Sequence, residues 1–413
     1  MNTNKNSKPK IYFIPSYIGS LKYYARILPF LQDKYDVRFL LLKKRETRED
    51  LIEYCKKKNF HLEILGDMAK GFRIPFLSPI IKRYKFIKKY REFLAEKQPV
   101  KIIYLWNMGQ ISNFIREANR MGIETMLLQI SFFGGSYKDF NKIKNGITSL
   151  DSFIYRWYHS VLSFFYRFLD PIFLGLNYIT LSEEPKKVGA GGVESAKDMA
   201  KTFISSKIHN VGMVDFQVVG DLQKQINSNS GFKEKLAKKH NINLNKLNIL
   251  FLTQHFFLAV KLVTDKELAE FFYKRFKNVR SIFSSQEADV LFKLHPGEKN
   301  RYQACEEDGA KIYNDEFLTE ELVCLSDLCI LDQWTGANCI VLASNKPAIF
   351  INLPPMQSSK ASLEYYHIKR TVDDEKEFLE ALKQFKQGGL EKQYDNSYID
   401  TKSIEKIVSF IEE

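Results

Sequence analysis

Cysteine is scarce in this sequence, and the few cysteines present lack the spacing of a structural site. There are five cysteines among 413 residues, an odd number, and no Cys-x-x-Cys pair occurs. These features argue against a disulfide framework and against a zinc site. Cys324 and Cys329 lie within apolar runs, so we expect both to be buried as small hydrophobic side chains. The cysteine pattern favours a protein of the reducing cytoplasm.

Long hydrophobic runs are also lacking. No uncharged run reaches the roughly 20 residues that a membrane-spanning helix needs. Residues 153–179 come nearest, but charged residues and Pro171 interrupt them. The N-terminal residues are polar and rich in lysine, and the apolar run Ile11–Ile14 after them is too short for the core of a signal peptide. We therefore expect a cytoplasmic protein.

Acidic residues are outnumbered by basic ones. Asp and Glu total 49 against 62 Lys and Arg, which gives a net charge of +13. A positive net charge favours binding of phosphorylated small molecules, anionic lipid or nucleic acid. No nucleic-acid recognition motif is present, so we do not expect nucleic acid as a partner. Two segments could make peripheral contact with the inner face of the cytoplasmic membrane, namely the basic helix predicted over residues 80–97 and the aromatic-rich residues 153–179. The first segment could equally present a solvated helix face, and the second could form a buried helix pair.

Glycine-rich phosphate motifs are missing as well. The turn after Ile11–Ile14 carries only Gly19, which excludes the dinucleotide fingerprint, and no Gly-Lys-Ser/Thr follows the glycines of residues 182–194. We expect residues 182–194 to form a polar loop. The sequence does contain a strand–helix–strand pattern, with a helix at Leu21–Leu31 and a second strand at Val37–Leu42. This pattern predicts an α/β fold with a parallel sheet.

The most informative stretch runs from Asp289 to Asn352. Within it, the apolar run Val290–Leu294 stops at a His-Pro-Gly-Glu turn, and the run Leu328–Leu331 stops at an Asp-Gln-Trp-Thr-Gly turn. A helix is expected from Ala337 to Ala343, opening at the second turn. In an open α/β sheet, ligands bind at the carboxyl ends of the strands, where helix N-termini attract phosphate. The two turns therefore predict a site for a phosphorylated ligand.

Three short motifs in this stretch resemble a known family. They are Lys293 with His295, Pro296 and Glu298; Asp332 with Thr335 and Gly336; and Lys346 with Pro347. Together they resemble the second domain of GT-B-type glycosyltransferases of the bacterial capsule and surface-polysaccharide group, which includes Kdo, sialic acid and polyol-phosphate transferases and the UDP-GlcNAc 2-epimerase relatives.

The resemblance implies an α/β architecture of two Rossmann-like parallel-sheet domains that face a central cleft. Residues 1–215 would form the acceptor-side domain, and residues 216–400 would bind the nucleotide-sugar. A terminal helix in residues 401–413 is expected to cross back to the first domain.

The resemblance also implies the residues of the donor site. The family holds the phosphates of a nucleotide-activated donor with the histidine of the His-Pro turn and with a helix N-terminus, so His295 is our first candidate for a catalytic residue. These groups can stabilise the leaving group without a metal ion, and no Asp-x-Asp occurs at a suitable strand end, so no metal or other cofactor is expected. The expected donor-binding residues are Gln254, His255, Lys293, Pro296, Glu298, Asp332, Gln333, Thr335, Gly336 and Ala337.

An inverting transferase also needs a general base near the acceptor. Asp67 and Glu124 are the carboxylates near strand ends predicted in the first domain, and we choose Asp67. The residues expected on the acceptor side of the cleft are Gly19, Asn107 and Gln129.

We therefore predict a glycosyltransferase, of hexosyl or Kdo/sialyl type, that moves a sugar from a nucleotide-activated donor to a surface polysaccharide or a lipid-linked glycan. An isomerase of the UDP-GlcNAc 2-epimerase type would share the fold, although the turn Pro15–Ser20 differs from the Gly-Thr-Arg-Pro-Glu turn usual in that group. Two more functions would fit the same motifs: a transferase that uses a CDP-activated polyol phosphate, and a non-catalytic protein that binds lipid or glycan.

Overall fold

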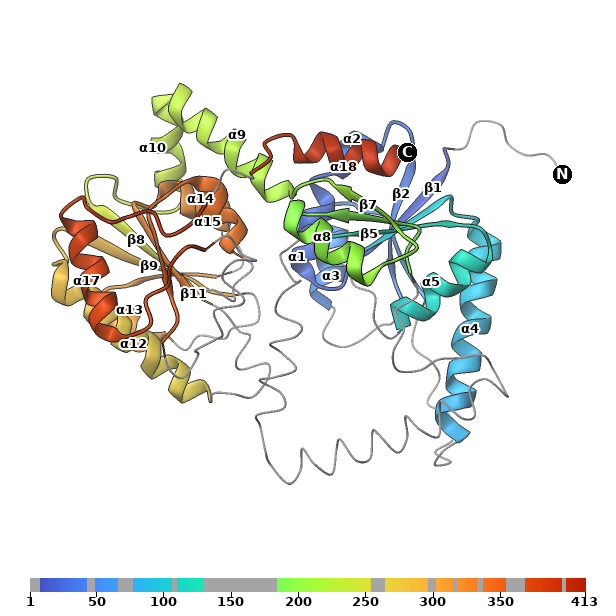
Figure 1. Ribbon diagram of the computed structural model, residues 1–413, viewed down its shortest axis with the longest axis horizontal. Helices are drawn as coiled ribbons and strands as arrows, with labels where there is room; N and C mark the ends of the chain where they lie inside the picture. The colour runs from blue at the N-terminus through green and yellow to red at the C-terminus, as the bar shows by residue number, and fades with distance from the viewer. Residues whose placement is uncertain are drawn as a thin grey trace. The chain divides into compact units, whose positions relative to one another are not determined.

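The chain forms two compact units, each built on its own parallel sheet (Figure 1). A computed structural model describes residues 8–42, 49–65, 77–105, 110–129, 184–253, 264–295, 302–314, 318–332, 337–353, 368–395 and 399–413. Among these, the first unit comprises the residues up to 129, residues 184–212 and Ile404–Glu413. The second unit comprises Met213–Ser403.

The first unit contains a parallel sheet of seven strands in the order β3-β2-β1-β4-β5-β6-β7. Its strands are β1 (Lys10–Ile14), β2 (Asp36–Leu41), β3 (Leu62–Ile64), β4 (Lys101–Tyr104), β5 (Glu124–Leu128), β6 (Lys187–Ala190) and β7 (Lys207–Asn210). Its helices are α1 (Ile18–Ala25), α2 (Leu28–Leu31), α3 (Glu49–Lys57), α4 (Leu77–Lys97), α5 (Gln110–Arg120), α8 (Val193–Thr202) and α18 (Ser403–Glu412).

Helices bury both faces of this sheet, which explains why its interior strand β1 contains a continuous apolar run. In β1 every residue of Ile11–Ile14 is buried. The inner face of α4 adds four apolar side chains to the core, those of Ile87, Tyr90, Phe93 and Leu94. The outer face carries charges of both signs, and several of them are paired: Lys88 lies 3.8 Å from Glu92, and Arg91 lies 2.6 Å from Glu117 of α5.

The C-terminal helix α18 packs on β6 and β7 of the first unit. Gly189 of β6 makes room for it, because a Cβ there would lie 3.1 Å from Cε1 of Phe410. Ile407, Phe410 and Ile411 are buried. At the helix end, the Lys101 ammonium donates a hydrogen bond to the Ile411 carbonyl.

The second unit contains a parallel sheet of five strands in the order β10-β9-β8-β11-β12. The strands are β8 (Leu247–Leu252), β9 (Ala288–Lys293), β10 (Lys311–Tyr313), β11 (Leu328–Asp332) and β12 (Ala348–Ile351). The helices are α9 (Val214–Ser228), α10 (Ser230–Lys239), α12 (Asp265–Ile282), α13 (Gln303–Glu307), α14 (Thr319–Leu325), α15 (Asn338–Ser344) and α17 (Glu375–Lys386).

A separate hydrophobic core covers each face of this second sheet. One core contains Leu250, Leu291 and Leu331 from the strands, and the other contains Phe251 and Phe292, whose rings stack 4.7 Å apart. All five cysteines of the chain are free and buried, which confirms the expectation for Cys324 and Cys329. Burial raises the pKa of both these thiols to about 12.

The loop expected over residues 182–194 is wrong for part of its length. β6 occupies Lys187–Ala190, and α8 begins at Val193. Tertiary pairing overrides the weak local pattern here, because β6 lies between β5 and β7 and the ammonium of Lys187 lies 2.9 Å from the carboxylate of Glu124. No helix of the described residues combines the length and the apolar content needed to cross a membrane.

Candidate functional site

The carboxyl ends of the second sheet's strands form the candidate site. The strand order changes direction between β8 and β11, because the chain runs outward to β9 and β10 on one side and to β12 on the other. Connections diverge at such a point and leave a crevice in which α/β proteins bind ligands. The pairing of Leu331 with Leu252 places the next residues, Asp332 and Thr253, level with each other at this edge.

One hydroxyl group fixes the position of His295 at this edge. Thr253 is buried, and its hydroxyl donates to the carbonyl of Lys293 (3.2 Å) while accepting from the backbone N–H of His295 (2.9 Å). The backbone N–H of Thr253 also donates to the Lys293 carbonyl (3.1 Å). The end of β8 therefore holds the residue that leaves β9, and the side chain of His295 is exposed. Sequence reasoning missed Thr253, although a threonine directly after the apolar run Leu247–Leu252 was a usable signal.

Lys293 lies beside His295 and is 6 % exposed. Its ammonium donates to the carbonyl of Leu294 (2.9 Å) at the same strand end. Side chains alternate along a strand, so Lys293 shares a face with Leu291, in the core that also contains residues of α15. The structure thus brings a buried positive charge and an exposed imidazole to the same edge, two positions apart.

The end of β11 is the next part of this edge. Asp332 is the last residue of the strand and pairs with Ile351 of β12. Ala337 precedes α15, a short buried helix that ends at Asn345 in the left-handed conformation (φ 54°). The helix expected from Ala337 to Ala343 is therefore present.

A polar group that the sequence does not single out lies at the end of β12. Val372 forms a parallel bridge with Ile351, which brings Asp373 to the carboxyl edge. The Asp373 carboxylate accepts hydrogen bonds from the Asn352 amide (3.2 Å) and from the Thr371 hydroxyl (2.7 Å). In the sequence this aspartate belongs to a charged run late in the chain. Its place at the sheet edge depends on a bridge between residues far apart in sequence.

Several of the expected site residues lie outside the residues that the structure describes. The expected site residues that lie outside are Asp67, Asn107, Gln254, His255, Pro296, Glu298, Gln333, Thr335 and Gly336. For Asp332 the backbone is described but the side chain is not. The segment 153–179 lies outside as well.

In the first unit, Gln129 ties two strand ends together. Its backbone N–H donates to the carbonyl of Gly189 (2.9 Å), and its side-chain carbonyl accepts from the N–H of Gly191 (2.9 Å). Gln129 is 2 % exposed and thereby positions the glycine turn that precedes α8. Gly19 lies in the first turn of α1, which follows β1, and β1 is two strands away from the strand β5 that precedes Gln129.

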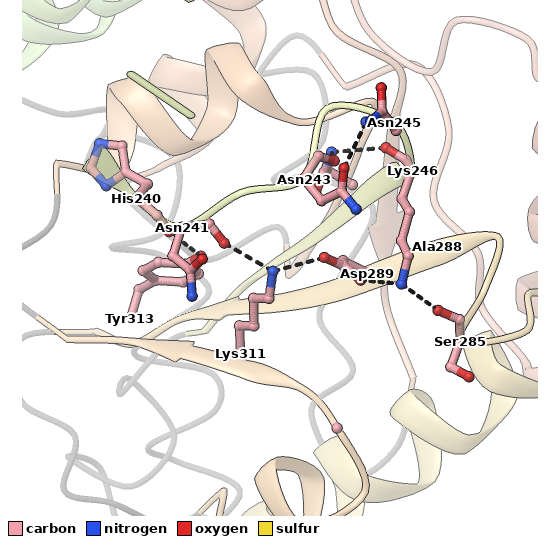
Figure 2. Close-up of polar contacts among 12 residues, drawn as sticks. His240, Asn241, Asn243, Asn245, Lys246, Ser285, Ala288, Asp289, Lys311 and Tyr313 are labelled. Atoms are coloured by element: carbon pink, nitrogen blue, oxygen red, sulfur yellow. Dashed lines mark hydrogen bonds and ion pairs between the residues drawn. The ribbon is translucent and has the colours of Figure 1, made fainter. Parts of the chain in front are cut away.

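The opposite, amino edge of the second sheet carries a network of paired charges. Figure 2 shows the carboxylate of Asp289 between the ammonium groups of Lys246 (3.3 Å) and Lys311 (2.8 Å). Burial acts to raise the pKa of Asp289, but the hydrogen bonds and charges of the two lysines outweigh it and lower the pKa. Lys246 and Lys311 also donate to the carbonyls of Ser285 and Asn241, so this edge is occupied by structural contacts (Figure 2).

The first sheet repeats this arrangement at its amino edge. Glu124 lies between Lys101 (3.0 Å) and Lys187 (2.9 Å), at the beginning of β5. The alternative general base therefore lies at the edge away from the carboxyl ends of the strands and serves as a structural ion pair. No cluster of three or more metal-ligating side chains occurs within the described ranges.

Comparison with known proteins gives one family match and many structural ones. The alpha-2,8-polysialyltransferase (POLYST) family matches residues 191–329, about a third of the chain. The match covers β8 and β9 and hence the Thr253–His295 contact. No curated protein matches the sequence.

Solved structures match over nearly the whole chain at low identity. UDP-GlcNAc 2-epimerase from Neisseria meningitidis, bound to UDP-GlcNAc, is 11 % identical with a TM-score of 0.59, and the match covers 97 % of this chain and 99 % of that one. MurG of Acinetobacter baumannii is 11 % identical with a TM-score of 0.53, over 98 % and 99 %. A UDP-glucosyltransferase from Polygonum tinctorium is 8 % identical with a TM-score of 0.52, over 98 % and 99 %. The chain has the GT-B fold of these proteins and is similar over about a third of its length to the alpha-2,8-polysialyltransferase family.

Proposed function

We propose that this protein is a glycosyltransferase that transfers a sugar of the sialic acid type from a CMP-activated donor to a surface polysaccharide or lipid-linked glycan. The observation that carries the proposal is the family match over residues 191–329, because it includes the strand ends at which Thr253 positions His295. The GT-B fold supports the same class of reaction.

The chemistry follows from the groups at this edge. When the bond between sugar and nucleotide breaks, negative charge develops on the leaving phosphate and must be stabilised. The exposed imidazole of His295 can donate an N–H to a phosphate oxygen, and the Thr253 hydroxyl fixes the backbone from which it projects. Lys293, the last residue of β9, adds positive charge at the same strand end. We propose that Asp373 and Asn352 at the end of β12 contribute acceptors for donor hydroxyl groups.

The remaining expectations complete the proposal. We infer that the helix start after Asp332, with Gln333, Thr335 and Gly336, binds the donor phosphate, and that Gln254, His255, Pro296 and Glu298 line the same site. Transfer is expected to proceed without a metal ion and hence to persist in EDTA. Asp67 is proposed as the general base, with Asn107 beside the acceptor.

A thermal-shift experiment with CMP, CDP, UDP, GDP and ADP tests the donor site. A ligand bound only by the native state stabilises it by about 2.7 kcal/mol at a hundredfold excess over Kd. We expect CMP to raise the unfolding temperature of the wild type and of His61→Ala, a control at an exposed histidine of the first unit. We expect the effect to be absent in His295→Ala. An equal CMP response in wild type and His295→Ala would overturn the site, and no response to any nucleotide would overturn the function.

The epimerase alternative rests on the structural similarity to UDP-GlcNAc 2-epimerases. It predicts a response to UDP in place of CMP and conversion of UDP-GlcNAc without an acceptor. A response to CDP alone would favour the polyol-phosphate transferase. Incubation of the wild type with each sugar nucleotide, with and without a glycan acceptor, separates the three functions. Only the epimerase turns over its substrate without an acceptor, and the two transferases differ in the nucleotide of the donor that they consume.

A further inference from the structure

The turn between β1 and α1 lies at the point where the first sheet also changes direction. β1 lies beside the middle strand β4. The chain proceeds from β1 to β2 and β3 on one side, while β4 leads to β5, β6 and β7 on the other. The carboxyl ends of β1 and β4 therefore flank the position at which the connections diverge. The turn after β1 contributes Ser16 and Tyr17 to this position, and Gly19 follows in the first turn of α1.

Gly19 provides the surface on which the ring of Tyr17 lies. A Cβ added at Gly19 would lie 2.6 Å from Cε2 and 3.1 Å from Cδ2 of Tyr17. Carbon atoms do not approach so closely, so the observed ring position requires glycine at this place. One side of the ring is thus packed against the start of α1, while Tyr17 as a whole is 44 % exposed.

Ser20 fixes the backbone that carries this ring. Its hydroxyl accepts hydrogen bonds from the N–H groups of Ser16 (2.9 Å) and Tyr17 (3.1 Å) and donates to the carbonyl of Tyr17 (2.6 Å). Ser20 itself is fully buried. The backbone of Tyr17 is therefore held on both its N–H and its carbonyl, and little freedom is left to lose on binding.

Further phenol groups lie near this ring. Tyr24 of α1 is completely buried, and its pKa is raised first by burial and then by the neighbouring hydroxyls of Tyr23, Tyr17 and Tyr104. The exposed part of the Tyr17 ring offers an apolar surface with the ring's own hydroxyl at one edge, because Tyr23, Tyr24 and Tyr104 are themselves buried. Binding sites for small polar molecules combine these two properties.

We propose that the Tyr17 ring is a platform on which a sugar ring of the acceptor stacks. A pyranose presents C–H groups on one face and hydroxyls around its edge, which matches a flat aromatic surface with a polar border. The inference rests on the proposed function, in which the second unit binds the nucleotide and the first unit binds the acceptor. It assigns acceptor recognition to a residue that the donor site does not include.

Ligand-observed NMR with unlabelled trisaccharides tests the platform without a donor. The probes are trimers of α2,8-linked sialic acid and of N-acetylglucosamine, and the proteins are wild type, Tyr17→Phe, Tyr17→Leu, Gly19→Ala and Phe30→Ala. Gly19→Ala leaves the tyrosine in place but forces its ring to move. Phe30 of α2 is 53 % exposed and serves as the matched aromatic control.

We expect one trimer to bind wild type, Tyr17→Phe and Phe30→Ala alike. Tyr17→Leu and Gly19→Ala should bind about tenfold more weakly, because an aromatic contact of this kind typically contributes a factor of that order. The C–H protons of one sugar face should receive the strongest saturation. Unfolding temperatures equal to that of the wild type exclude a folding defect as the cause.

Three results would overturn the platform: wild-type affinity in Tyr17→Leu, an equal loss in Phe30→Ala, or no binding of either trimer to a wild type that still responds to CMP. In the last case the proposed function stands without the platform. If a trimer binds in a Tyr17-dependent way and no nucleotide shifts the unfolding temperature, the platform stands and the proposed function fails.

Discussion

At the residue scale, a single threonine hydroxyl determines where the most important candidate side chain lies. Thr253 connects the end of β8 to the end of β9 and accepts from the N–H of His295 at 2.9 Å. A hydroxyl can donate one hydrogen bond and accept others at once, so it can satisfy two backbone groups that leave the ladder at a strand end. The position of His295 is thus set by a neighbouring strand and not by its own turn alone.

Thr253→Val removes this hydroxyl and keeps the shape of the side chain. We expect a loss of about 1–2 kcal/mol in the free energy of unfolding, because two hydrogen bonds of a buried hydroxyl are removed. CMP affinity should fall as well, because His295 is less well positioned. Urea unfolding and titration with CMP measure the two effects.

Thr253→Ser is the matched variant, since it keeps the hydroxyl. Thr253→Ser should bind CMP with an affinity near that of the wild type. If Thr253→Val bound CMP as well as wild type does, the role of Thr253 in positioning His295 would be refuted.

A second prediction at this scale concerns acid stability. The pKa of Asp289 is lowered, since the hydrogen bonds and charges of Lys311 and Lys246 outweigh burial, which acts to raise it. A carboxyl group whose pKa in the folded state lies below the unfolded value of about 3.9 stabilises the fold above that pH and loses this contribution as pH falls through the folded pKa. Asp289→Asn should therefore be less stable than wild type near pH 6, and the difference should shrink below about pH 4.

Urea unfolding at a series of pH values checks this dependence. Asp221→Asn is the control, because Asp221 pairs with Lys224 (3.4 Å) on the exposed side of α9, where ion pairs contribute little. The same pH-dependent difference in both variants would show that the Lys246–Asp289–Lys311 arrangement has no special role.

At the element scale, the close fit between α18 and β6 depends on one glycine. A methyl group at Gly189 would lie 3.0 Å from Leu128, 3.1 Å from Phe410 and 3.1 Å from Val211. These three neighbours come from β5, from α18 and from the residue after β7, so no single side chain can move aside to accept it. The packing of α18 on the first sheet therefore depends on the absence of a side chain at position 189.

Gly189→Ala should destabilise the protein by about 1 kcal/mol. Overpacking costs about 1–3 kcal/mol, and the lower entropy of the unfolded alanine chain offsets about 0.4–1 kcal/mol of this. The cost should be smaller in a Phe410→Leu background, since the ring that alanine crowds is then absent. Chemical denaturation of the two single variants and the double variant measures the coupling.

Gly220→Ala in α9 is the matched control. A Cβ there meets only Thr401, at an ordinary contact distance of 3.6 Å. Alanine in the interior of a helix is favoured over glycine by about 0.5–1 kcal/mol, so this variant should be as stable as wild type or more stable. A stabilising Gly189→Ala would contradict the packing that we describe.

At the scale of the whole molecule, the net charge of +13 should attract anionic surfaces. We propose that the basic helix in residues 80–97 makes this contact with the membrane. Vesicles that contain an anionic phospholipid should sediment with the protein, and the bound fraction should fall as NaCl rises from about 0.05 to about 0.5 M, because salt screens the attraction. Neutral vesicles should bind little.

Two charge-reversal pairs distinguish the helix from the net charge. Lys85 and Lys88 lie on the exposed face of α4, and Lys235 and Lys238 lie on the exposed face of α10 in the second unit. Changing both lysines of a pair to glutamate alters the net charge equally in each case. Greater loss of vesicle binding in the α4 variant is expected, and equal losses would refute a specific role for residues 80–97.

The sequence by itself determined the fold class and much of the donor edge. Apolar runs that end in polar turns predicted β9 and β11, and the strand–helix–strand opening predicted a parallel sheet, because these patterns depend on residues close together in the chain. His295 and Lys293 could be chosen for the same reason. The motif of Asp332, Thr335 and Gly336 could also be recognised, because its residues are close together in the sequence.

Only the tertiary structure decided which distant residues share an edge. Thr253 contacts His295 from the adjacent strand, Asp373 reaches the end of β12 through the Val372 bridge, and the weak β6 pattern became a strand between β5 and β7. Strand order and register set each of these contacts, and neither is encoded in the spacing of neighbouring residues. The Tyr17 ring on Gly19 belongs to the same class, because a glycine at the start of a helix does not reveal which side chain fills the space that it leaves.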